Sequence, residues 1–75
     1  MAHVTIYTSA NCPGCSSAKR FFQERGVHYT EHNISENLDK AQELIDKTGQ
    51  MSVPVIEIDG EYIIGFDKRR LSTSL

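Results

Sequence analysis

The sequence predicts an α/β fold, in which a four-stranded mixed sheet carries helices on both faces and the elements follow the order β-α-β-α-β-β-α. Two observations indicate this order. Residues 3–34 show a strand pattern, a helix pattern and a second strand pattern, and such a βαβ unit makes two parallel strands joined by a right-handed crossover. Asp59-Gly60 separates two later apolar runs, and this dipeptide is typical of a type I′ hairpin, which adds two antiparallel strands.

The first half of the chain alternates strand and helix patterns. Residues 3–8 are rich in β-forming side chains and almost continuously apolar, which predicts a central strand buried on both faces. Residues 13–25 carry apolar side chains at helical spacing, and Gly26 provides the left-handed residue that commonly ends a helix. Residues 27–34 turn polar after Tyr29, so they predict an edge strand.

A second helix is predicted between the edge strand and the hairpin. Ser35 is predicted to cap its first turn, and Gly49 to end it. Its apolar face is predicted to consist of Leu38, Ala41, Leu44 and Ile45, and its ion pairs of Glu36–Lys40 and Glu43–Lys47.

The hairpin and a short helix close the chain. The hairpin strands are predicted at residues 53–58 and 61–64. Asp67 can cap a last helix that runs through Leu75, with Leu71 and Leu75 facing inward.

Composition limits the function classes. The 75 residues predict a single domain, 1–75, with a modest core. A net charge of −2 gives no reason to expect nucleic acid or an anionic membrane as a partner, and no run of 18 apolar residues predicts a membrane span. The N-terminus enters a strand without a basic and apolar leader, so we expect a cytoplasmic protein. We also expect it to be a monomer. In a reducing compartment, two cysteines three positions apart are more often catalytic than structural.

Both cysteines lie in Cys12-Pro13-Gly14-Cys15, between the first strand and the first helix. Pro13 suits the first helical position, which makes Cys12 the predicted N-cap and places Cys15 one turn into the helix. Unpaired N–H groups at a helix N-terminus favour a thiolate, so the Cys12 pKa should fall below the free value of about 8.5, to roughly 4–7.5. We therefore predict that Cys12 is the nucleophile and Cys15 the buried, resolving thiol of a redox dithiol. No titratable side chain adjoins the motif in sequence, so the helix N-terminus is expected to carry most of this stabilisation.

Other uses of two cysteines remain open on the sequence. A metal site, a static disulfide and two incidental thiols are compatible with C-x-x-C. A soft-metal carrier for Cu(I) would use the two thiolates as ligands, but such proteins follow the order βαββαβ, which differs from the order predicted here. His28 and His32 lie about 13 Å apart if they share a strand, so they are not predicted to hold one ion.

Three motifs together carry a family resemblance: Cys12-Pro13-Gly14-Cys15, Ser52-Val53-Pro54 and Gly65-Phe66-Asp67. With the element order, they make nearly the whole chain resemble the glutaredoxins of the thioredoxin superfamily. The resemblance implies a thioredoxin-like fold and a cis Val53–Pro54 bond beside the dithiol. It also implies glutathione or substrate contacts at Val53, Pro54, Gly65, Phe66 and Asp67.

The chain departs from many glutathione-using glutaredoxins in this resemblance. It has Gly14 where they carry an aromatic residue, Phe66 where they carry a second glycine, Met51 where they often carry a basic residue, and no lysine shortly before Cys12. The chain is therefore also similar to small glutaredoxin-like redoxins, including those that serve ribonucleotide reductase and accept electrons from thioredoxin reductase.

Reversible thiol–disulfide exchange is the expected function, with protein disulfides or glutathione mixed disulfides as substrates. We expect no metal and no tightly bound cofactor, with glutathione as a co-substrate. Glutathione and thioredoxin reductase both remain candidate electron donors. Two alternative functions remain open. One is Cu(I) binding, and the other is binding of an iron–sulfur cluster that two chains share through Cys12 and glutathione, as in some glutaredoxins.

Overall fold

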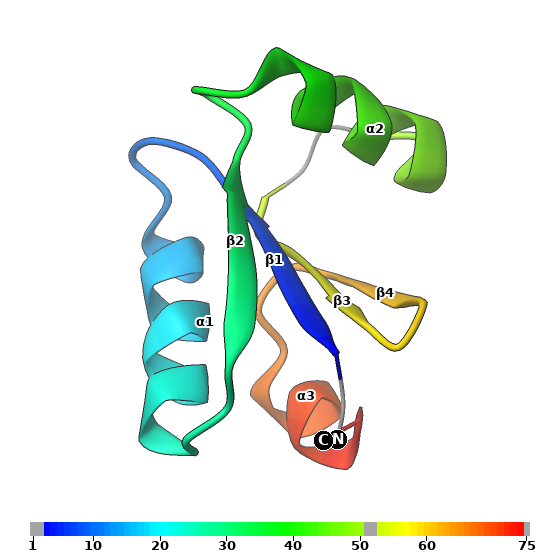
Figure 1. Ribbon diagram of the computed structural model, residues 1–75. Coiled ribbons are helices and arrows are strands. Elements are labelled where there is room, and N and C mark those ends of the chain that lie inside the picture. Colours follow the sequence, from blue (N-terminus) through cyan, green and yellow to red (C-terminus); the bar gives the residue numbers. More distant parts are fainter. Residues whose placement is uncertain (1–2, 51–52, 75) are drawn as a thin grey trace.

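The strands and helices of the protein follow the predicted order (Figure 1). The computed structural model describes residues 3–50 and 53–74. The elements are β1 (Val4–Thr8), α1 (Pro13–Glu24), β2 (Tyr29–Asn33), α2 (Leu38–Thr48), β3 (Val55–Ile58), β4 (Glu61–Ile64) and α3 (Lys68–Ser74). None of the helices within these ranges is long and apolar enough to cross a bilayer.

The four strands form one mixed sheet in the order β2-β1-β3-β4. β1 runs parallel to β2, in a register that pairs Val4 with Tyr29 and Thr8 with Asn33. β3 runs antiparallel to both β1 and β4. The predicted edge position of β2 and central position of β1 are therefore confirmed, and all five residues of β1 are buried.

Helices cover both faces of the sheet, as predicted (Figure 1). α1 and α3 pack on one face, where Phe22 and Leu71 join Ile6 in a buried cluster. α2 packs on the other face, where Leu44 joins Tyr7. Alternate residues of β1 thus feed two separate cores, which explains why the strand sequence is apolar almost throughout.

The start of α2 differs from the prediction. Asn37 is the N-cap, and its side-chain oxygen accepts a hydrogen bond from Lys40 N at 3.2 Å. Ser35 instead accepts a hydrogen bond from Ala10 N at 3.2 Å, which ties it to the loop after β1. Because the helix begins at Leu38, this residue lies at the open end of the helix and is 79% exposed, so its predicted place in the core is wrong.

The rest of α2 follows the prediction more closely. Ala41 and Leu44 are buried on its inner face. Glu43 pairs with Lys47 at 3.1 Å, as predicted, and also with Lys40 at 3.0 Å. Glu36, the predicted partner of Lys40, lies in the turn before the helix.

The hairpin and the last helix are as predicted except for their ends. Asp59 and Gly60 have φ angles of 50° and 88°, as a type I′ turn requires. β3 starts at Val55, two residues later than predicted. Asp67 Oδ1 accepts a hydrogen bond from Arg70 N at 3.1 Å at the start of α3, and Leu71 is fully buried. The inward position predicted for Leu75 lies outside the described residues.

Candidate redox site

Cys12 caps the N-terminus of α1, as predicted. Its backbone is extended, with φ −116° and ψ 99°, and Pro13 is the first helical residue. The Cys12 carbonyl accepts hydrogen bonds from Cys15 N at 3.2 Å and Ser16 N at 3.3 Å. Cys12 Sγ also accepts from Cys15 N, at 3.2 Å. The sulfur therefore lies where the helix end presents backbone N–H groups, an arrangement that favours negative charge.

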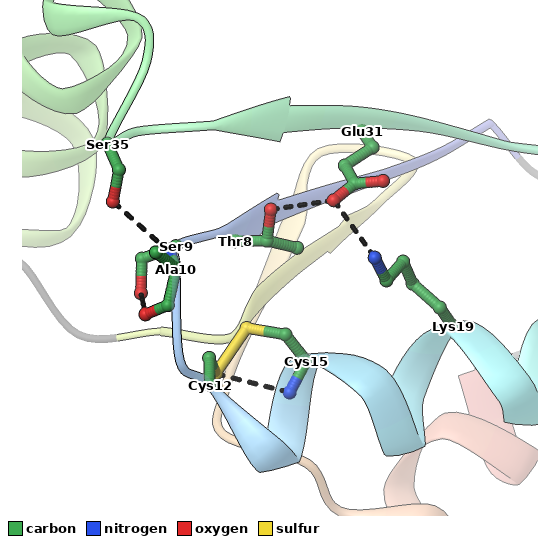
Figure 2. Close-up of a disulfide and its surroundings, with 8 residues drawn as sticks. All are labelled: Thr8, Ser9, Ala10, Cys12, Cys15, Lys19, Glu31 and Ser35. Carbon is green, nitrogen blue, oxygen red and sulfur yellow. Dashed lines mark hydrogen bonds and ion pairs between the residues drawn. A yellow bond between two sulfur atoms is a disulfide. The ribbon is translucent and has the colours of Figure 1, made fainter.

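Cys12 and Cys15 are joined by a disulfide, with their Cα atoms 5.3 Å apart (Figure 2). The two cysteines differ in access to solvent. Cys15 is 3% exposed, whereas Cys12 is only partly buried. An incoming disulfide can therefore reach Cys12, while Cys15 is placed to attack Cys12 from inside, and the assignment of nucleophile and resolving thiol stays a prediction that this difference supports.

Pro54 packs against Gly14 of the motif. The Val53–Pro54 bond is cis, as the resemblance implied. A Cβ atom on Gly14 would lie 3.1 Å from Pro54 Cδ, so the missing side chain at Gly14 permits this close approach. The Pro54 carbonyl in turn accepts a hydrogen bond from Gly65 N at 2.8 Å, which links the Pro54 loop to the chain after β4.

The predicted contact residues divide into two groups. Val53 and Pro54 are joined to Gly65 by the hydrogen bond from Gly65 N to the Pro54 carbonyl, and Pro54 lies beside the motif. Phe66 packs its ring edge-on against Phe21 of α1, with centroids 6.0 Å apart. The remaining residue, Asp67, has one carboxylate oxygen engaged in capping α3. The structure therefore brings Val53, Pro54 and Gly65 together. Phe66 packs against α1 instead, and Asp67 caps α3.

A pocket of about 440 Å³ opens beside the motif, with lining residues from α1 and β2. It is lined by Thr8, Ser9, Asn11, Cys12, Pro13, Cys15, Ser16, Lys19, Glu31 and Asn33. Glu31 Oε2 accepts hydrogen bonds from the Thr8 hydroxyl at 2.8 Å and from Lys19 Nζ at 3.2 Å (Figure 2). The bond from Thr8, and after it the bond and charge of Lys19, hold the pKa of the Glu31 carboxyl below its usual range.

Sequence reasoning missed these two charged groups, which line the pocket beside the motif. The expectation that the helix N-terminus carries most of the thiolate stabilisation stays a prediction. Lys19 carried a usable signal, because it follows Cys15 by four positions and therefore lies on the same face of α1. Glu31 carried none, because only the register of β1 and β2, which pairs Ile6 with Glu31, brings it to the pocket.

Metal ligands are sparse around the site. Across residues 3–50 and 53–74, no three His, Cys, Asp or Glu side chains gather closely enough to hold one ion. Cys12 and Cys15 remain the pair of soft ligands that lie together, and the structure holds them as a disulfide.

The chain is similar in sequence to known proteins. A family model described as Glutaredoxin matches residues 4–63. Glutaredoxin 3 of Escherichia coli K12 is 42% identical over 67 residues, which cover 89% of this chain and 81% of that protein.

Solved structures resemble the whole fold. The crystal structure of the thioredoxin-like protein BC3987 has a TM-score of 0.91 and 29% identity, covering 96% of this chain and 99% of that one. NrdH-redoxin from Escherichia coli has a TM-score of 0.86 and 25% identity, covering 95% of this chain and 92% of that one. It is a glutaredoxin-like protein described as having a thioredoxin-like activity profile.

Proposed function

Because the chain belongs to the glutaredoxin family, we propose that it is a thiol–disulfide oxidoreductase that uses Cys12 and Cys15 to reduce protein disulfides or glutathione mixed disulfides. One observation carries the proposal. An accessible sulfur caps a helix N-terminus, and its buried partner lies one turn away, close enough to close a disulfide with it. This arrangement supplies both an activated nucleophile and an internal thiol that resolves the intermediate.

The reaction consists of two exchange steps. The Cys12 thiolate attacks one sulfur of a substrate disulfide, the substrate S–S bond breaks, and the released thiolate takes up a proton. Cys15 then loses its proton and attacks Cys12 Sγ in the mixed disulfide. The second substrate sulfur leaves as a thiol, and the Cys12–Cys15 disulfide remains. Two electrons have passed to the substrate, and an external donor must return two electrons to the dithiol.

The Pro54 loop is the proposed docking edge for the substrate chain. Pro54 has no N–H group, and its carbonyl is already bonded to Gly65 N, so Val53 is the neighbouring residue whose backbone would pair with an extended peptide. For glutathione, the Val53 backbone would bind the cysteinyl part, and the Asp67 oxygen not used in capping would bind the γ-glutamyl part.

We propose thioredoxin reductase as the electron donor, with activity in the cytoplasm and disulfide proteins such as ribonucleotide reductase as substrates. The missing lysine before Cys12 and the residues Gly14, Met51 and Phe66 weaken the case for a glutathione site. The similarity to NrdH-redoxin, with its thioredoxin-like activity profile, supports the same choice.

A coupled assay of NADPH oxidation with a model protein disulfide tests both levels of the proposal. One arm contains thioredoxin reductase, and the other contains glutathione and glutathione reductase. We expect turnover in the first arm only, and none with Cys12→Ser in either arm. Turnover in the second arm only would overturn the choice of donor. If fully reduced protein gives no NADPH oxidation in either arm, the proposed oxidoreductase activity is refuted. Tight, reversible binding of Cu(I) would then identify a soft-metal carrier.

A further inference from the structure

Two opposite charges share the pocket with the two sulfur atoms, and the exchange steps above assign them no role. Lys19 reaches from α1 and Glu31 from β2, and Lys19 Nζ lies 3.2 Å from Glu31 Oε2 (Figure 2). Their side chains are 32% and 34% exposed, so each is partly shielded from water. The Thr8 hydroxyl also donates a hydrogen bond to Glu31 Oε2, at 2.8 Å. Thr8 lies in β1 and is only 2% exposed, so it holds the Glu31 carboxylate in place.

These charges act on a dithiol in opposite directions. An ammonium group near a sulfur favours the thiolate, whereas a carboxylate disfavours it. Because the two charges oppose each other, the pair is expected to shift the thiolate less than either charge alone, which would leave the helix N-terminus as the main favourable influence. Other charged groups around α1 lie elsewhere, since Arg20, Glu24 and Lys68 line a separate pocket with Phe21 and Phe66.

We propose that the Lys19–Glu31 ion pair is a tuning element for the dithiol, in which Lys19 favours the thiolate, Glu31 opposes it, and their balance sets the reduction potential. Both are positioning residues, since they act through the sulfurs and not on the substrate. The proposal rests on the redox role of Cys12 and Cys15. It concerns a property of the free protein, so it can be measured without any substrate or donor.

The tuning has a defined sign for each partner. Loss of Lys19 leaves the Glu31 carboxylate unpaired and destabilises the thiolate, so the reduced dithiol becomes a stronger reductant. Loss of the Glu31 charge leaves the Lys19 ammonium unpaired and stabilises the thiolate, so the disulfide becomes a stronger oxidant. If the ion pair were merely structural, the two substitutions would not shift the Cys12 pKa and the reduction potential in opposite directions.

Two isosteric or near-isosteric variants test these signs. Glu31→Gln keeps an oxygen for the Thr8 hydroxyl, and Lys19→Gln keeps a polar side chain of intermediate length. The Cys12 pKa is read from thiolate absorbance and alkylation rate against pH. We expect the thiolate-to-thiol ratio to fall about threefold to tenfold in Lys19→Gln and to rise by a similar factor in Glu31→Gln. The reduction potential is measured separately by equilibration with a reference dithiol, where a tenfold change in the exchange equilibrium constant corresponds to about 30 mV.

The chain offers matched controls on the outer face of the same helix. Arg20 and Glu24 also form an ion pair, at 3.7 Å, with side chains 82% and 71% exposed. Arg20→Gln and Glu24→Gln make the same changes in net charge at positions that do not line the pocket. We expect less than a twofold change in the thiolate ratio for either control, because exposed charges are screened by water and salt.

The double variant Lys19→Gln/Glu31→Gln decides between tuning and distortion. Tuning by charge predicts that it returns to within about twofold of the parent, and that 1 M salt shrinks both single effects. Shifts of equal sign in the two single variants, shifts no larger than those of the controls, or a double variant that adds them up would overturn the proposal. A failed coupled assay with these shifts intact would overturn the proposed donor or substrate and leave the tuning in place.

Discussion

Sequence periodicity predicts that both Leu71 and Leu38 face the core, whereas the structure buries only Leu71. Truncating each leucine in turn tests this difference. Leu71 lies in α3 and is fully buried, packed with the residues of α1 and the sheet. α3 has 7 residues, too few to form a stable helix alone, so its docking depends on such contacts. Leu71→Ala removes the main apolar anchor of this helix, and we expect it to cost about 2–5 kcal/mol.

That cost is large for a chain of this size. Domains have about 0.05–0.15 kcal/mol of stability per residue, which gives about 4–11 kcal/mol for 75 residues. The unfolding entropy near 60 °C is about 2.1 cal/mol/K per residue, or about 160 cal/mol/K here. A loss of about 2.5 kcal/mol therefore lowers the Tm by about 16 °C.

Leu38→Ala is the matched control. Leu38 is 79% exposed at the first position of α2, so its truncation should change stability by about 0.5 kcal/mol or less. Both variants are compared with the parent by thermal and urea unfolding followed by circular dichroism. A Leu38→Ala cost that equals or exceeds that of Leu71→Ala would refute the assignment of these two residues.

Further outcomes follow from the turn, the helix cap and the pocket. Gly60→Ala should cost about 1–2 kcal/mol in urea unfolding, because its φ of 88° is strained for a residue with a Cβ; an unchanged midpoint would contradict the turn type. Asn37→Ala should cost about 1 kcal/mol, and Ser35→Ala about half of that or less, in the same assay; the reverse order would restore Ser35 as the cap. The Glu31 pKa is lowered on folding, so its stabilisation is present above about pH 4.5 and is lost as the pH falls below that value; Tm measured from pH 7 to 3 should therefore fall less in Glu31→Gln than in the parent, and parallel curves would contradict the Thr8 and Lys19 contacts.

Local sequence signals predicted most of the fold because each is set by local backbone physics. The apolar run of β1 predicted its central position, because a strand buried on both faces needs apolar side chains on both. Asp59-Gly60 predicted the hairpin, because these residues readily adopt the positive φ angles of its turn. The cap of α2 was mispredicted because Ser35 and Asn37 are both good capping residues. Ser35 contacts Ala10, from a loop 25 positions away, and periodicity within α2 contains no information on that contact.

The candidate site divides in the same way. Cys12 and Cys15 were predictable from their spacing and from Pro13, because the helix start fixes their geometry. The proximity of Pro54 to Gly14 came from family resemblance alone, since the two positions are 40 apart in sequence. Glu31 required the strand register, which no local pattern encodes.

The central claim is that Cys12 attacks and Cys15 resolves, and single-cysteine variants test it most directly. Each reduced variant is mixed with a protein disulfide, quenched with acid and analysed by intact mass. We predict that Cys15→Ser accumulates a covalent one-to-one adduct through Cys12, and that Cys12→Ser forms none because Cys15 is 3% exposed. An adduct with Cys12→Ser, or continued reduction of the substrate by it, would contradict the account.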